Sequence, residues 1–254
     1  MTESDRPFLL TVMLSVTHDP YEVPGWYAEP EKKPLARYRQ AIEYTDSFIR
    51  AVDEKLNKLN LNDDTILVVV GDHAEAFGEH GLFGHERIGF EEVLRVPFVL
   101  RATSLIKSAA EITEPVTSTD LTPTILALLG FDTRRADFDG RNTLSQLPRD
   151  RRLYFSGWLD TGPAGFVQAR MKRIYNSASD NVTMYDLTAD PLELTTIEPP
   201  AAKAHDIADN IIQWRKSTFF QLDPNAPKEV VLYDNWLITH EERIATAKRL
   251  QKED

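Results

Sequence analysis

The feature that most constrains the fold is an uninterrupted apolar run, Thr65–Val70, which leads directly into Gly71, Asp72 and His73. Because β-branched residues dominate the run and no polar residue alternates within it, it is typical of a strand buried on both faces of a helix-covered parallel sheet. In open α/β sheets, ligands bind beyond the carboxyl ends of the strands. The run therefore predicts an α/β fold with Asp72 and His73 at the edge where a site is expected.

The segments around this run complete a strand–helix–strand pattern. Phe8–Val16 is a short apolar run that predicts another buried strand, and Leu35–Leu59 has apolar or aromatic positions every three or four residues, as in an amphipathic helix. Together with Thr65–Val70 they predict a βαβ unit with a right-handed crossover. A further strand is expected at Val96–Arg101. We thus expect a mostly parallel sheet sandwiched by helices.

The pattern changes after Arg149, where short β-like pieces predict a small antiparallel subdomain followed by helices. The pieces are Leu153–Trp158, Gly165–Ala169, Arg173–Asn176 and Thr183–Asp186, and the helices are Ala201–Phe220 and Glu241–Asp254. We therefore expect an α/β catalytic part over residues 1–149 and a β-rich subdomain with C-terminal helices over residues 150–254.

Composition excludes several classes of function. The 254 residues contain no cysteine, so disulfides, zinc–thiolate sites and cysteine nucleophiles are excluded. The net charge of −11 argues against nucleic acid as a partner, because phosphate backbones are held by basic patches. No window approaches the roughly 20 apolar residues that span a bilayer, so no membrane segment is predicted in this chain.

The negative charge is concentrated in residues 72–92, which we call the acidic loop. Its 21 residues carry six acidic side chains, one basic side chain and three of the six histidines. Convergent titratable groups favour a metal or phosphate-type site. The alternative is a solvated loop in which Asp72 caps the chain and His80 is exposed. Glu75 and Glu79 are expected to support a ligand or to be solvated rather than to bind a metal directly.

His18 is the other histidine that ends a predicted strand. If Phe8–Val16 lies in the same sheet as Thr65–Val70, then His18 opens onto the same edge as Asp72. Taken alone, a histidine in this position is more often an ordinary loop residue with its hydrogen bonds satisfied.

Several segments in fixed order resemble the sulfatase and alkaline-phosphatase superfamily over roughly residues 8–198. They are LLTVMLSVTHDPYEVP, YRQAIEYTDSFIRAVDEKL, VVVGDHAEAFGEHGLFGHE with the following EEVLRVPFVL and TSTDLTPTILALLG, and MKRIYNSASDNVTMYDLTADPLEL. The resemblance is strongest to the branch of lipoteichoic acid synthases, phosphoethanolamine or phosphoglycerol transferases and related membrane-linked sulfatases. It implies an alkaline-phosphatase-like α/β fold. A relative of phosphoglycerate mutase would share the Asp-His pair but fits the other segments less well.

The resemblance also implies metal-dependent hydrolysis or transfer of sulfate or phosphate esters. A divalent ion, Zn²⁺, Mn²⁺, Mg²⁺ or Ca²⁺, would activate a nucleophile and neutralise charge on the transferred group. Asp72 and His73 match the late pair of metal ligands. His85 matches a catalytic histidine that contacts the transferred group or leaving oxygen, and His18 matches the substrate-side histidine. Ala74 stands where the family usually has glycine.

One part of the family pattern has no counterpart in this sequence. The early metal carboxylate and the nucleophile precede the His18 segment in the family, and no substitute occurs here, because Ser15 and Thr17 lie on the wrong side of His18 and Ser156-Gly157 lacks the surrounding pattern. We therefore expect an incomplete alkaline-phosphatase-like fold from a longer enzyme.

We therefore expect two partners for this chain. They are a sulfate- or phosphate-ester substrate and the missing N-terminal half of the catalytic domain. By resemblance the location is extracytoplasmic, with anchoring to a membrane through an absent N-terminal region. The alternative hypothesis is a non-catalytic binding or metal-sensing module that keeps the same fold.

Overall fold

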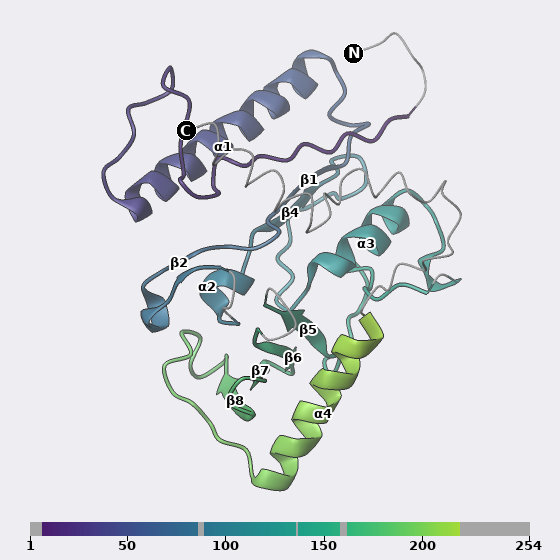
Figure 1. Cartoon of the computed structure of the whole chain (residues 1–254). Coiled ribbons are helices and arrows are strands. Elements are labelled where there is room, and N and C mark those ends of the chain that lie inside the picture. Colours follow the sequence, from purple (N-terminus) through teal and green to yellow (C-terminus); the bar gives the residue numbers. More distant parts are fainter. Residues whose placement is uncertain (1–6, 86–88, 136, 158–161, 219–254) are drawn as a thin grey trace, which may run out of the picture. The chain divides into compact units, whose positions relative to one another are not determined.

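The computed structural model describes residues 7–85, 89–135, 137–157 and 162–218 (Figure 1). The chain divides into two compact units, residues 1–211 and 212–254. All the elements that concern the candidate site lie in the first unit. The predicted helix Glu241–Asp254 and the end of the strand predicted at Leu153–Trp158 lie outside the described residues.

The first helix, α1, spans Pro34–Lys58 and confirms the amphipathic helix expected from the sequence. Proline suits the first turn because its missing N–H would have no helical partner there, and Lys55 and Lys58 place positive charge beside the free carbonyls of the last turn. Arg101 forms an ion pair with Asp53 on this helix. No helix in the described ranges is long and apolar enough to cross a membrane.

Strands β1 (Leu67–Val70) and β4 (Phe98–Arg101) confirm the two strands predicted on either side of the acidic loop. They pair antiparallel, with Val68 opposite Leu100, and the Gly71 N–H extends the ladder to the Pro97 carbonyl at 3.1 Å. Among the described residues, these strands have no parallel neighbour and are only half-buried. The setting predicted for Thr65–Val70, buried on both faces of a parallel sheet, is therefore not found in this part of the chain.

The prediction of a buried strand at Phe8–Val16 is wrong for this structure. The segment has no strand pairing, and several of its apolar side chains are exposed, including Leu9 at 88% and Met13 at 82%. An extended segment becomes a strand only when a neighbour accepts and donates its backbone hydrogen bonds, and no described residue does so here. The βαβ unit expected from this segment is consequently not formed.

The acidic loop folds as a short hairpin followed by one helical turn. Strands β2 (Ala76–Phe77) and β3 (Phe83–Gly84) pair antiparallel around the 3₁₀ turn η1 (Glu79–Gly81), and α2 spans Glu91–Leu94. Gly78, with φ of 118°, supplies a conformation that side-chain-bearing residues rarely adopt. The described residues of the loop therefore include regular secondary structure, although residues 78–83 are exposed.

A short helical region follows β4 and is anchored by a buried carboxylate. It comprises the 3₁₀ turn η2 (Ser118–Asp120), α3 (Leu121–Leu128) and the 3₁₀ turn η3 (Thr133–Arg135). Asp120 is fully buried, accepts the Thr117 N–H at 2.9 Å, and binds both terminal nitrogens of Arg151 at 2.7 and 2.9 Å. This pair ties the helical region to the start of the next sheet.

The predicted antiparallel subdomain is confirmed. Its four strands form a meander in the order β5, β6, β7, β8, and α4 follows (Figure 1). The bounds are Leu153–Ser156 for β5, Ala164–Gln168 for β6, Met171–Asn176 for β7, Asn181–Asp186 for β8 and Ala201–Thr218 for α4. The domain boundary at residue 149 or 150 stays a prediction.

Gly165 in β6 provides a test of the packing of this sheet. A Cβ atom there would overlap the Arg173 carbonyl oxygen and lie 2.5 Å from Cζ of Phe155. Gly165→Ala should therefore lower the free energy of unfolding in urea by about 3 kcal/mol, because neighbouring backbone must move. Gly25→Ala is the control, since a Cβ there meets nothing within 4 Å. Equal unfolding midpoints for the two variants would contradict this packing.

Candidate active site

Three histidines from separate segments meet beside the hairpin of the acidic loop. The imidazole rings of His73 and His85 are stacked with centroids 4.1 Å apart, and the His18 ring meets the His85 ring edge-on at 5.6 Å. His18 is thus brought to the same place as Asp72 and His73, although the strand that was expected to carry it there is not formed. All four residues predicted for the site lie in one cluster.

At two of the three rings, a hydrogen bond to a backbone carbonyl occupies Nδ1 and leaves Nε2 for another partner. Nδ1 of His18 lies 3.0 Å from the Asp19 carbonyl oxygen, and Nδ1 of His73 lies 3.1 Å from that of Ala74. A carbonyl oxygen only accepts, so each Nδ1 carries the proton and Nε2 is the basic nitrogen of the neutral ring. Such rings are oriented to bind a metal or a substrate proton through Nε2.

His85 is oriented by a carboxylate instead of a backbone carbonyl. Its Nδ1 donates to Oε1 of Glu75 at 3.0 Å, and the Glu75 side chain is only 5% exposed. Glu75 also accepts a hydrogen bond from Tyr21, and burial together with this bond raises the pKa of the Tyr21 hydroxyl well above its ordinary value. Glu75 therefore supports the site from behind. The sequence predicted the same role for Glu75 and Glu79. Only the fold shows that Glu75, and not Glu79, contacts His85.

Asp72 is the exposed member of the cluster, with 89% of its side chain accessible. Its Oδ1 accepts the backbone N–H of His73 at 2.9 Å, and its Oδ2 lies 3.9 Å from Nε2 of His73. The latter distance is too long for a hydrogen bond but close to the roughly 3.4 Å that separates two tetrahedral ligands of one small cation. A carboxylate oxygen and an unprotonated imidazole nitrogen fit a divalent ion in kind.

The donor set is nevertheless small. Within the described ranges, no group of three or more histidine, aspartate or glutamate side chains is placed to hold one metal ion. Zinc and similar ions ordinarily take at least three protein ligands. Asp72 and His73 therefore fit as part of a metal site rather than as a complete one.

The remaining described carboxylates of the loop are used within the protein. Glu79 accepts the Phe77 N–H at 2.6 Å, and Glu92 pairs with Nδ1 of His80 at 2.8 Å. His80 is exposed as a residue, as the alternative interpretation allowed, but its imidazole is only 17% exposed and is stacked on Phe90 with centroids 3.9 Å apart. His80 is thus a structural residue of the loop.

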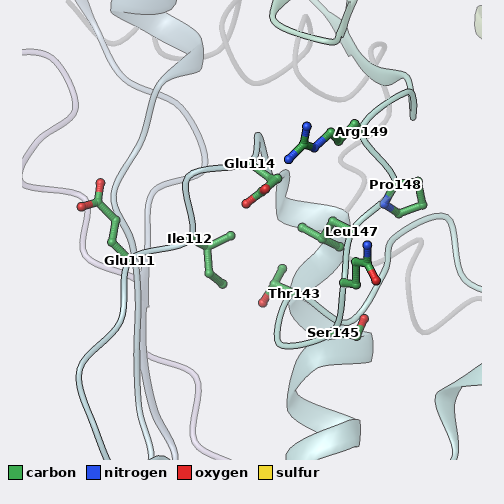
Figure 2. Close-up of a pocket in the computed structure, with 9 residues that line it drawn as sticks. Glu111, Ile112, Glu114, Thr143, Ser145, Leu147, Pro148 and Arg149 are labelled. Carbon is green, nitrogen blue, oxygen red and sulfur yellow. The ribbon is translucent and has the colours of Figure 1, made fainter.

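A cavity of about 640 Å³ lies away from the histidine cluster, and Figure 2 shows the side chains around it. Asp72, His73, His85 and His18 do not line it. Its lining comes from two segments and consists of Glu111, Ile112, Glu114, Thr143, Ser145, Gln146, Leu147, Pro148 and Arg149. The candidate active site is therefore an open surface rather than this hollow.

Comparison with known proteins shows which family the chain that carries this cluster belongs to. The family model described as Sulfatase matches residues 1–131, which is more than half of the chain and includes all four site residues. The chain belongs to the sulfatase family. Over 209 residues this family member is 30% identical to the multifunctional alkaline phosphatase superfamily protein PehA of Trinickia caryophylli, covering 72% of this chain and 40% of that protein.

Solved structures confirm the α/β fold. BT4656 in complex with its substrate D-glucosamine-2-N,6-O-disulfate gives a TM-score of 0.56 at 23% identity, covering 74% of this chain and 42% of that one. The lipoteichoic acid synthase LtaP from Listeria monocytogenes gives 0.57 at 18% identity, covering 79% and 51%. This sulfatase-family chain therefore has the predicted alkaline-phosphatase-like fold in part, and it spans about two fifths of the length of PehA.

The His80–Glu92 pair should make the stability of the protein depend on pH. Burial lowers the pKa of His80, but the hydrogen bonds to Glu92 and to the Glu193 carbonyl outweigh it and raise the pKa above its ordinary value. The stabilisation is therefore fully present below about pH 6.5 and is lost as the pH rises through the raised pKa. We expect His80→Gln to lower the free energy of unfolding by about 1–2 kcal/mol at low pH, and by less at high pH.

Urea unfolding of both proteins between about pH 5.5 and 8.5 measures this difference. His205→Gln is the control, because the His205 imidazole bonds only to a carbonyl of its own helix. A His80→Gln effect that is constant over this range, or that grows with pH, would show that the pair does not titrate as described.

Proposed function

We propose that this chain contributes part of the active site of a metal-dependent enzyme that hydrolyses or transfers sulfate or phosphate esters. The observation that carries the proposal is the meeting of His18, His73 and His85 beside the exposed Asp72, with two ring distances of 4.1 and 5.6 Å. Membership of the sulfatase family supports the reaction class.

Asp72 and His73 are the residues that would hold the divalent ion. When bound, such an ion neutralises charge on the transferred group and activates the attacking oxygen. The hydrogen bond from the His73 ring to the Ala74 carbonyl orients Nε2 for this purpose, and the Asp72 carboxylate supplies the negative charge. Further ligands and the nucleophile come from outside the described residues in this proposal.

His85 is the group best arranged to handle a proton. Glu75 accepts its Nδ1–H and orients the ring, so Nε2 is the nitrogen that would exchange a proton with the leaving oxygen of the ester. His18 stands against the edge of the His85 ring, where it can contact the substrate through its own Nε2. Both roles need substrate on the exposed side of the cluster.

We also propose that the N-terminal half of the sulfatase domain covers the apolar surfaces left open here. Leu9, Met13 and Val99 are 88%, 82% and 59% exposed although they lie in strand-like apolar runs. Burying such surface is the main favourable contribution to association. Following the family, we place the assembled enzyme outside the cytoplasm, with its membrane anchor in that half.

An assay of p-nitrophenyl sulfate and p-nitrophenyl phosphate with Mn²⁺, Zn²⁺, Mg²⁺ or Ca²⁺ tests the proposal. The chain is measured alone and mixed with the polypeptide encoded directly upstream. We expect turnover only in the mixture, and at least a tenfold loss with Asp72→Asn or His73→Gln, as for other changes at metal sites. Asp46→Asn, on the exposed face of α1, should retain full activity.

Three results would count against this proposal. Turnover by the chain alone would show that it is not part of a divided site, and full activity of Asp72→Asn would remove the metal role. Mn²⁺ binding without turnover in the mixture would favour the alternative, a binding or metal-sensing module.

A further inference from the structure

The antiparallel subdomain places one lysine in an unusual environment. Lys172 in β7 is fully buried, and its Nζ lies 2.7 Å from Oε1 of Glu91 and 2.8 Å from Oε1 of Glu193. It also donates to the Gly89 carbonyl at 3.2 Å and sits 5.6 Å from the centre of the Phe155 ring. A buried ammonium is tolerated only when opposite charges and acceptors surround it. Of the three oxygen acceptors around Lys172, the Glu91 carboxylate and the Gly89 carbonyl belong to the acidic loop.

Glu193 contacts Lys172 and holds the same loop through two further groups. One carboxylate oxygen faces Lys172, the other accepts the backbone N–H of Glu91 at 2.7 Å, and the Glu193 carbonyl accepts Nε2–H of His80 at 3.1 Å. Glu193 is 2% exposed and has a φ of 54°, which a residue other than glycine adopts only when its surroundings impose it. Its place is therefore determined by these contacts.

The anchored turn is hydrogen-bonded to the residue that follows the candidate metal pair. The Ala74 N–H, immediately after His73, donates to the Val93 carbonyl at 2.8 Å, within the helical turn that Glu193 caps. Ala76 and Val93 are buried against each other and against Phe90. A displacement of this turn would consequently move the backbone on both sides of Glu75.

We propose that Lys172 and Glu193 are positioning residues that hold the acidic loop in the geometry that brings His73 to His85. They touch neither Asp72 nor the histidine cluster and act through α2. The effect of these two residues on catalysis rests on the function proposed above. Their effect on the geometry of the loop does not depend on that function. Loss of the Lys172 charge leaves the buried Glu193 without its cation, and loss of the Glu193 charge leaves Lys172 with Glu91 alone, so either change loosens the loop.

Amide hydrogen exchange of the full chain, followed by mass spectrometry, tests the proposal. Glu193→Gln and Lys172→Met should each speed exchange at least tenfold in peptides covering residues 72–85. The same variants should shift the imidazole ¹⁵N signals of His73 and His85, because the stacking of the rings changes. Asp120→Asn is the matched control, since it weakens another ion pair, between the fully buried Asp120 and Arg151, and none of the hydrogen-bond partners described for Asp120 lies in the loop.

The double variant Lys172→Met/Glu193→Gln keeps the test decisive if a single variant does not fold. It removes both buried charges together, so its melting temperature should lie nearer the native value, while exchange in residues 72–85 stays fast. Lower melting temperatures without faster loop exchange, or equal loop exchange in Asp120→Asn, would overturn the proposal. Failure of the ester-cleavage assay would not alter these exchange rates and would count only against the proposed function.

Discussion

The buried ammonium of Lys172 is the constraint on which the arrangement of the candidate site depends. Because a charge without partners is strongly unfavourable in a protein interior, β7 can pack against the rest of the chain only where Glu91 and Glu193 meet it. This requirement joins three segments that lie far apart in the sequence. The backbone hydrogen bond from Ala74 to Val93 then carries the constraint to the histidine cluster.

Pairing within the protein also compensates most of the negative charge described in the acidic loop. The sequence suggests that a bound cation offsets the six carboxylates, but most of the described ones already have partners in the protein. Glu75 supports His85, Glu91 faces Lys172, and Glu92 pairs with His80. Asp72 remains open to solvent beside His73. Among the described residues of the loop, a cation would thus meet the exposed Asp72 carboxylate rather than a dense acidic surface.

Much of the fold could be predicted from local patterns. The amphipathic repeat identified α1, and the alternation and length of apolar runs identified β1, β4 and the four-stranded meander. The motif at Asp72, His73 and His85, with His18 earlier in the chain, selected residues that the fold brings together. Glu75 was expected only to support a ligand or to be solvated, and Lys172 and Glu193 were given no role, because a buried carboxylate or lysine looks like any surface charge until its distant partner is known.

The sequence by itself determined most of the longer helices and strands and which side chains can bind a metal or move a proton, because periodicity, capping and side-chain chemistry are local properties. Only the tertiary structure decided that β1 pairs antiparallel with β4, that Phe8–Val16 stays unpaired, and that Glu75 lies behind His85. Strand pairing and burial depend on what lies opposite a residue. The apolar pattern of Phe8–Val16 predicts a segment that is buried against other residues. The described residues do not cover it.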